Sequence, residues 1–302
     1  MTLQQATNTM LQQLIKLARP QQWLKNGFIF LPLFFSGQLG NLSNWYAAIV
    51  VFVAFCFASS SIYCFNDILD AEADREHPKK KLRPIASGKI GAKAAYVLML
   101  ALLSLSGATI VLFAREKCVP LLLTIGVYCL INIAYCVKLK HFAIVDVLII
   151  AIGFVLRVAS GGIAASIAVS QWIVLMTFLL ALFLAFAKRR DDVVIFRKTG
   201  ITVRKNTARY NLNFINQVLG IIAAVTIVCY IMYTVSDEVV TRLNNHYVYL
   251  TSIFVLAGIL RYLQVALVDE KSENPTQILL KDRFIQACIL CWIASFFIII
   301  YA

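Results

Sequence analysis

The chain has 302 residues, of which 61% are hydrophobic and only 14% are charged, and its formal net charge is +13. Soluble domains carry roughly 25% charged residues, so this composition excludes a soluble protein and indicates an integral membrane protein with several helices. The positive charge does not indicate a nucleic-acid-binding protein. The cations lie in loops between apolar segments, where they reflect membrane topology and attract anionic ligands or lipids.

Apolar segments long enough, or nearly so, to cross a bilayer follow one another along the chain. They lie at 27–40, 45–65, 95–114, 119–137, 143–163, 171–187, 214–235, 248–268 and 284–302. The first is the weakest, because it is short and contains Pro32. Residues 1–21 begin with a polar stretch and have an amphipathic pattern, which predicts a short interfacial helix and no cleavable signal peptide. We therefore expect one all-α domain over residues 1–302 with about nine transmembrane helices.

Loop cations indicate how these segments are oriented. One set of loops contains nearly all of the lysines and arginines, whereas the opposite loops hold only Arg115, Lys117 and Arg242. The positive-inside rule places the cation-rich loops and the N-terminus in the cytoplasm, and nine crossings of the cell membrane leave the C-terminus outside. Two cytoplasmic loops, 66–94 and 188–213, are long and contain acids as well as bases, so we expect them to border an active site.

An acidic stretch follows the second apolar segment. Asp67, Asp70 and Asp74 are spaced i, i+3, i+7 and would share one face of a continuing helix, beside Asn66. Carboxylates are costly beside a bilayer, and three on one face repel one another unless a cation neutralises them. Mg²⁺ prefers a few carboxylates together with phosphate oxygens. The stretch therefore predicts a site for a metal-chelated phosphate or diphosphate, against the alternative of a solvated loop helix.

A cationic run comes directly after the acidic stretch. We consider Arg75, Lys81 and Arg83 candidate phosphate ligands, since arginine offers phosphate a planar fork and lysine a point charge. The lysines at 79–81 are equally well explained as ordinary positive-inside loop charge. His77 precedes Pro78, so a structural role in a turn is as well supported as a catalytic one.

Further cations accompany the fifth apolar segment. Asp146 and Arg157 are three helical turns apart, so they would share one helix face about 16 Å apart along the axis. An arginine at membrane depth needs an acidic partner or an anionic ligand, which indicates either a phosphate site or a buried ion pair to another helix. Tyr135, Lys138 and Lys140 precede Asp146 and are candidates for the same phosphate site.

Two further groups of cationic residues lie next to apolar segments. Lys188 and Arg189 follow the sixth apolar segment directly, where they either bind a substrate phosphate or carry ordinary loop charge. Lys25, next to Asn26, either lines a cavity or caps the first apolar segment.

The stretch NDILDAEADREHPKKKLRPIASG, from Asn66 to Gly88, resembles the first aspartate-rich motif of the UbiA-type intramembrane prenyltransferase superfamily. With RPQQWLKN (19–26), LKHFAIVD (139–146), LRVASGG (156–162) and AKRRDD (187–192), it is similar to the decaprenyl-phosphate phosphoribosyltransferase branch. The usual second DxxxD motif is reduced to the lone Asp146, because Ile150 stands at i+4, and that branch shares this feature. Asp192 stands where we expect glutamate.

The resemblance implies a ring of nine transmembrane helices around a central cavity open to the cytoplasm. It implies transfer of 5-phosphoribose from phosphoribosyl diphosphate (PRPP) to a polyprenyl phosphate, with Mg²⁺ as cofactor and a role in cell envelope biogenesis. In this interpretation Asp67, Asp70 and Asp74 hold the metal beside Asn66, and the cations named above bind the substrate phosphates. The length of the polyprenyl chain stays open, as does the choice between a monomer and a homo-oligomer.

Two alternatives stay open as well. A conventional member of the superfamily would move a prenyl group from a prenyl diphosphate to an aromatic acceptor with the same aspartates. The many cations argue against it, since an aromatic acceptor needs fewer phosphate ligands. A non-enzymatic transporter would explain polar residues at membrane depth, but not the spacing of the aspartates beside Arg75 and Arg83.

Overall fold

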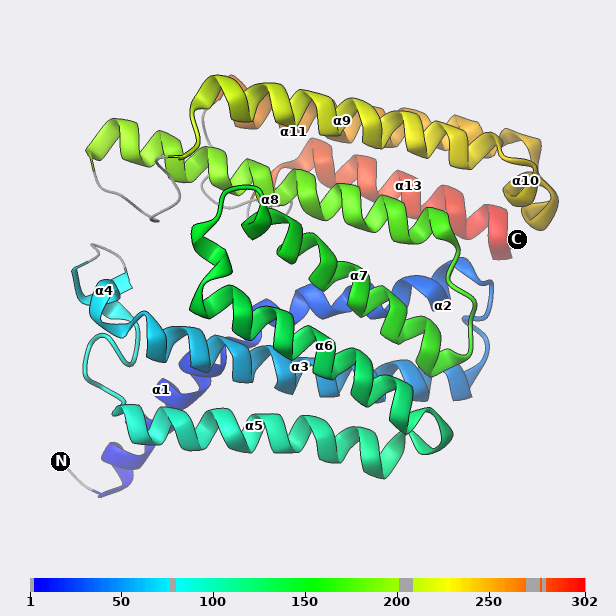
Figure 1. Ribbon diagram of the computed structural model, residues 1–302. Coiled ribbons are helices and arrows are strands. Elements are labelled where there is room, and N and C mark those ends of the chain that lie inside the picture. Colours follow the sequence, from blue (N-terminus) through cyan, green and yellow to red (C-terminus); the bar gives the residue numbers. More distant parts are fainter. Residues whose placement is uncertain (1–2, 77–79, 201–208, 270–277, 279–280, 302) are drawn as a thin grey trace. The chain divides into compact units, whose positions relative to one another are not determined.

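The computed structural model describes residues 3–76, 80–200, 209–269, 278 and 281–301 (Figure 1). The regular structure of these residues is helical, as the sequence predicts. His77 and Lys79, considered above, lie outside the described residues. The chain divides into two compact units: Met1–Lys140 with Gly153–Val169, and His141–Ile152 with Ser170–Ala302.

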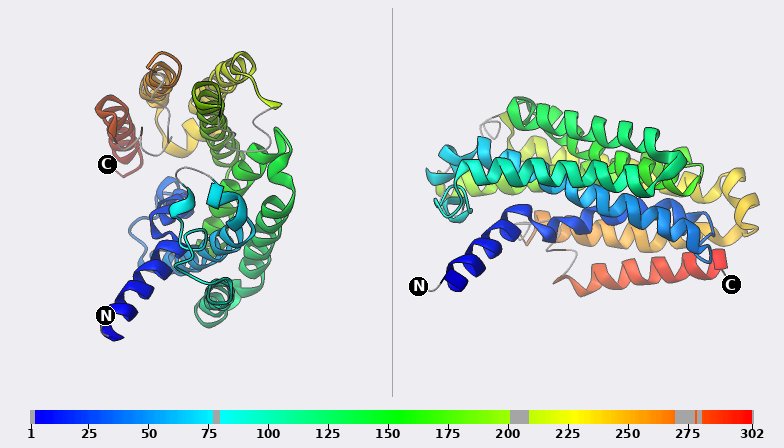
Figure 2. Two further views of the ribbon diagram at one scale, coloured as in Figure 1. Left: turned by 90° about the vertical axis from the view of Figure 1, so that its left-hand side faces the viewer. Right: turned by 90° about the horizontal axis from the view of Figure 1, so that it is seen from below.

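The first unit is built around a long helix, α3 (Leu42–Leu69). Its other elements are α1 (Leu3–Ala18), the 3-10 helix η1 (Pro20–Phe30), α2 (Leu31–Phe35), α4 (Ala71–Glu76), η2 (Lys80–Leu82), α5 (Ala92–Phe113), η3 (Arg115–Lys117), α6 (Cys118–Val137) and the second part of α7 (Val145–Ala165). Helices α3 and α5 lie side by side (Figures 1 and 2), and Ser61 and Ser106 each donate to a carbonyl of the other helix, at 2.9 and 2.8 Å. Such hydrogen bonds are typical of helices that pack within a bilayer.

The second unit contains the start of α7, which follows η4 (Leu139–His141). Its other elements are α8 (Gln171–Thr199), α9 (Leu212–Val235), α10 (Asp237–Leu243), η6 (His246–Thr251), α11 (Ser252–Leu267) and α13 (Arg283–Tyr301). Phe186, Ile215, Leu219 and Ala266 belong to its apolar core.

Among the described residues, eight helices are long and apolar enough to cross a membrane. They cover Leu42–Leu69, Ala92–Phe113, Arg115–Val137, Val145–Ala165, Gln171–Lys198, Leu212–Val235, His246–Leu267 and Arg283–Tyr301. They correspond in order to the predicted segments from 45–65 to 284–302. The first predicted segment, 27–40, is not among them, because η1 and α2 replace a single α-helix there.

The segment formed by η1 and α2 nevertheless runs antiparallel along α3. From the end of α3 to its start, the contacts are Arg19 with Asp67 at 2.5 Å, Trp23 with Ser60 at 2.9 Å, and the ring of Phe30 with those of Phe52 and Trp45 at 5.5 and 5.7 Å. Pro20 and Pro32 lie in the first turn of η1 and α2, where a missing N–H is tolerated. The segment therefore covers most of the length of a membrane-crossing helix without being one regular α-helix.

Helices also extend further into charged segments than predicted. Helix α8 continues to Thr199, so residues 188–199, predicted as part of a cytoplasmic loop, are helical. The reason is burial and pairing: Arg189 donates to Asp192 at 2.8 Å, and Arg190 donates to Asn216 of α9 at 2.9 Å. Likewise residues 66–69, predicted to start a loop, belong to the last turn of α3.

Candidate functional site

The acidic stretch lies where α3 ends and α4 begins. Helix α3 ends at Leu69 and α4 starts at Ala71, so the stretch is not the single continuing helix that the sequence predicts. The backbone N–H of Asp74 still donates to the carbonyl of Asp70 at 2.8 Å, which keeps the chain close to a helical course. The side chain of Asn66 donates to Asp70 at 3.0 Å, and Asp67 and Asp74 are buried.

Each of the three aspartates has a cationic partner. Nη1 of Arg83 donates to Oδ1 of Asp67 at 3.1 Å and to Oδ2 of Asp74 at 2.6 Å. Arg19 donates to the same oxygen of Asp67 at 2.5 Å, and Lys140 donates to Oδ1 of Asp70 at 2.6 Å. Three cations thus neutralise the three carboxylates, which removes the repulsion that their spacing would otherwise cause.

The predicted set of three metal-binding aspartates is not assembled around one point. Within the described part of the chain, no group of three or more Asp, Glu, His or Cys side chains is placed as metal ligands are. The pair Asp67 and Asp74 does fit a divalent cation, because carboxylates are the ligands that Mg²⁺ prefers, and one nitrogen of Arg83 already places positive charge between them. Burial raises the pKa of Asp74 although Arg83 and Lys80 oppose it, so further positive charge would favour its ionised form.

A second cationic centre lies deeper in the same unit. Arg157 of α7 is only 5% exposed, and its guanidinium donates to Oδ1 of Asn26 at 2.7 Å, to the carbonyl of Gly153 at 2.7 Å and to the hydroxyl of Tyr128 at 3.1 Å. It also lies 4.8 Å from the ring centroid of Tyr128, a cation–π distance. All these partners are neutral, and no ion pair joins Arg157 to a carboxylate of the described residues.

Lys25 adds to this positive charge. It lies within electrostatic reach of Arg157, Arg19 and the predicted site residue Tyr135. No ion pair links Lys25 to any described residue. Arg157 and Lys25 together form a region of positive charge at which no described carboxylate makes an ion pair, which suits an anionic ligand.

Asp146, which the sequence predicts on the same helix face as Arg157, belongs to the part of α7 that lies in the second unit. In the second unit, Asp146 is fully buried and accepts hydrogen bonds from Nε of Arg189 at 2.5 Å and from the hydroxyl of Tyr210 at 2.9 Å. Asp192 binds the same guanidinium at 2.8 Å. The lone aspartate of the second motif is therefore a partner of Arg189, and two carboxylates balance the charge of Arg189.

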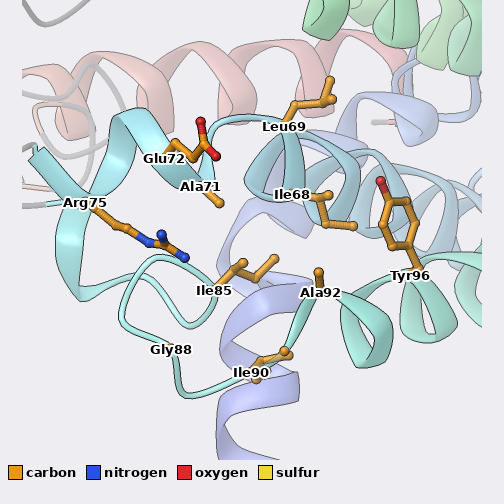
Figure 3. Close-up of a pocket in the computed structure, with 11 residues that line it drawn as sticks. Ile68, Leu69, Ala71, Glu72, Arg75, Ile85, Gly88, Ile90, Ala92 and Tyr96 are labelled. Atoms are coloured by element: carbon orange, nitrogen blue, oxygen red, sulfur yellow. The ribbon is translucent and has the colours of Figure 1, made fainter.

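Four of the predicted phosphate ligands are exposed side chains. Arg75 is exposed on α4 and lines a different pocket, without Asp67, Asp70 or Asp74 (Figure 3). Lys81, Lys138 and Lys188 are exposed as well, and no ion pair of Lys81 or Lys138 with an aspartate of the acidic stretch is found among the described residues.

Arg19 and Tyr128 were absent from the predicted site. Arg19 belongs to the segment RPQQWLKN, and its φ of 53° is in the left-handed region, which residues other than glycine adopt infrequently. Tyr128 sits in an apolar helix and cannot be told from a core residue by sequence. Its hydroxyl group becomes informative only beside Arg157.

The chain is similar over nearly its whole length to known proteins. The sequence profile of the UbiA prenyltransferase family matches residues 28–287. The chain is 35% identical over 300 residues to the decaprenyl-phosphate phosphoribosyltransferase of Mycolicibacterium smegmatis, covering 95% of this chain and 92% of that protein. It is 32% identical over 292 residues to the enzyme of the same name from Corynebacterium glutamicum, covering 95% and 86%.

Solved structures share the fold. A UbiA homolog from Archaeoglobus fulgidus bound to DMAPP and Mg²⁺ matches with a TM-score of 0.69 at 20% identity, covering 95% of this chain and 99% of that one. The apo structure of a UbiA homolog from Aeropyrum pernix matches with a TM-score of 0.62 at 18% identity, covering 87% and 96%. The predicted all-helical membrane fold is confirmed. The chain is therefore an integral membrane protein that belongs to the UbiA prenyltransferase family of transferases.

Proposed function

We propose that this protein transfers 5-phosphoribose from PRPP to a polyprenyl phosphate and releases diphosphate, with Mg²⁺ as cofactor. The observation that carries the proposal is the similarity along 95% of the chain to proteins named decaprenyl-phosphate phosphoribosyltransferase. The number of cations supports it, because this reaction involves two phosphorylated substrates. Its site would face the cytoplasm, where PRPP is available, and its product would serve envelope biogenesis.

The reaction exchanges one C–O bond for another. The bond from C1 of the ribose to the diphosphate breaks and its electron pair leaves with the diphosphate, while an oxygen of the lipid phosphate forms the new bond to C1. That oxygen is already anionic at neutral pH, so no strong general base is required, and none of the residues described above is assigned as one. Mg²⁺ held by Asp67 and Asp74 would supply charge neutralisation for the leaving diphosphate.

The cations of the first unit have distinct proposed roles. Arg83 orients Asp67 and Asp74 through its shared contacts, and Arg19 and Lys140 hold Asp67 and Asp70. Arg157 and Lys25, which lack an acidic partner among the described residues, hold a phosphate of the substrate. These preorganised charges stabilise the charge that develops as the bond to the diphosphate breaks.

The conventional prenyl transfer reaction is less well supported. It would use a second aspartate motif, and here the aspartate at that position, Asp146, is bound by Arg189 and Tyr210. The fold shared with the archaeal homolog bound to DMAPP does not favour either reaction, because one fold serves different chemistry.

Purified protein assayed with labelled PRPP, polyprenyl phosphate and Mg²⁺ tests the proposal. We expect a lipid-linked phosphoribose, identified by mass spectrometry, and no such product when EDTA removes the metal. Arg83→Gln should lower kcat/KM by about 100-fold, since it removes charge-assisted hydrogen bonds worth about 1.5–3 kcal/mol. Lys81→Gln, two residues away and exposed, is the matched control and should retain activity. A prenylated aromatic product without a lipid-linked ribose would overturn the proposal.

A further inference from the structure

A pocket separate from the acidic cluster lies on the exposed side of α4. It has a volume of about 440 Å³, within the usual range for small-ligand pockets. The end of α3, helix α4, the segment 85–91 and the start of α5 surround it, and its lining includes Ile68, Glu72, Arg75, Ile85, Ile90 and Tyr96 (Figure 3).

Two candidate membrane-crossing helices end at the pocket, which is where lipid headgroups would lie. The membrane-crossing helix α3 ends at Leu69 and the crossing helix α5 starts at Ala92, and both residues line the pocket. Tyr96 is exposed one turn into α5, where tyrosine commonly marks the membrane interface. Leu69 and Tyr96 provide exposed apolar surface at the ends of the two helices, whereas Ile85 and Ile90 are buried beneath the pocket. A lipid entering from the bilayer can thus place its headgroup beside α4.

Two side chains of opposite charge select the headgroup. Glu72 and Arg75 are three residues apart on α4, a spacing at which helical charges often pair. Neither makes an ion pair with another described residue. In Figure 3 the guanidinium of Arg75 extends toward Ile85, whereas the carboxylate of Glu72, on the same helix, points toward Leu69, so the two charges are separate. We propose that this pocket binds the headgroup of an aminophospholipid, with its phosphate on Arg75 and its primary ammonium on Glu72.

Other headgroups match these charges less well. A glycerol headgroup satisfies Arg75 but offers Glu72 no positive charge. A choline headgroup carries a quaternary ammonium without an N–H that could be donated to the carboxylate.

A bound lipid would also support the candidate site. The segment after η2 places Arg83 against Asp67 and Asp74, and two residues later it places Ile85 in the pocket. Occupancy of the pocket therefore stabilises the segment that positions Arg83.

Native mass spectrometry of the full chain in detergent tests this proposal. Equal amounts of phosphatidylethanolamine, phosphatidylglycerol and phosphatidylcholine with the same acyl chains are added, and the retained lipid is counted. We expect the ethanolamine lipid to be retained at least about tenfold over the others, which corresponds to about 1.4 kcal/mol. Lipid retention does not depend on the transferase reaction, so its failure is distinguishable from failure of the proposed function.

Variants separate the two charges. Arg75→Gln should lose retention of the ethanolamine lipid, Arg75→Lys should keep part of it, and Glu72→Gln should make the ethanolamine and glycerol lipids equal. Lys93→Gln, at an exposed lysine that does not line the pocket, should bind as the wild type does. Three outcomes would overturn the proposal: the wild type retains the three lipids equally, it prefers another headgroup, or Glu72→Gln keeps the wild-type selectivity. Each of these can be observed even if Arg75→Gln fails to fold.

Discussion

Arg157 is a guanidinium buried at membrane depth among neutral groups. Its three nitrogens donate to Asn26, Gly153 and Tyr128, so its geometry is fixed while its charge stays uncompensated by any carboxylate of the described residues. A charge in such a place is costly unless an anion approaches it. This combination of fixed geometry and free charge is what a phosphate ligand requires, and it can be tested at the level of the single residue.

We predict that Arg157→Gln raises KM for PRPP or for the lipid phosphate by about 10- to 100-fold, the loss expected for one charge-assisted hydrogen bond. Arg157→Lys should lose nearly as much, because one ammonium cannot replace a planar fork that reaches three partners. Steady-state kinetics with each substrate varied in turn measure both effects. Tyr128→Phe, which removes a single 3.1 Å hydrogen bond, is the control and should stay within about tenfold of wild type.

A lower unfolding temperature with unchanged KM values in Arg157→Gln would show instead that Arg157 only stabilises the fold. The kinetic and thermal measurements on one preparation thus separate a ligand from a structural residue.

Some residues of the candidate site can be predicted from the sequence and others cannot. The aspartates stood out because charge beside an apolar segment is rare and costly, and Arg83 follows them closely. The partners of Asp146 could not be predicted, because Arg189 and Tyr210 are 43 and 64 residues away and only the packing of helices brings them together. Proximity in sequence groups Arg75 with Arg83, but α4 turns Arg75 to the exposed side.

At the scale of elements, the close approach of α7 to η1 holds the cationic centre together. A Cβ atom at Gly161 of α7 would lie 2.0 Å from the carbonyl oxygen of Ile29, so only glycine fits there. The same approach allows Arg157, one turn earlier, to reach Asn26 of η1.

We predict that Gly161→Ala destabilises the protein by about 1–3 kcal/mol, because overpacking must displace the backbone of η1. A shift of this size lowers the unfolding temperature by several degrees, measured by circular dichroism in detergent. The matched control is Gly126→Ala on α6, where a Cβ would meet nothing within 4 Å and alanine favours the helix. Equal unfolding temperatures of the two variants would contradict the close packing.

Hydropathy predicts most of the elements because a membrane-crossing helix must satisfy its backbone internally and bury apolar side chains. Hydropathy does not predict elements that are held together by other interactions, such as packing against a neighbouring helix or pairing of charged side chains. The segment 20–35 is divided into η1 and α2, with Pro32 in the first turn of α2, and α3 packs along it. Helix α8 continues past its apolar part because Arg189 and Asp192 neutralise each other within it.

For the whole molecule, the number of crossings decides on which sides the two ends lie. The eight candidate helices alone would return the chain to the side of its start. If the segment along α3 also crosses, the chain makes nine crossings and its ends lie on opposite sides. The contact of Arg19 with Asp67 supports nine crossings, because it places the start of η1 at the same end of α3 as the acidic stretch. We propose that this end faces the cytoplasm, as the positive-inside rule predicts.

This topology predicts which loops a cytoplasmic enzyme can reach. A biotin acceptor peptide placed ahead of Met1 or after Lys89 should be modified by a biotin ligase in the cytoplasm of intact cells, whereas one placed after Glu116 should not. Modification after Lys89 but not ahead of Met1 would mean that the segment 20–35 does not cross the membrane. Modification only after Glu116 would reverse the orientation and place the acidic cluster on the face away from cytoplasmic PRPP. Either result would therefore bear on the proposed reaction as well as on the fold, because the substrate must reach Asp67 and Asp74 from the side on which it is made.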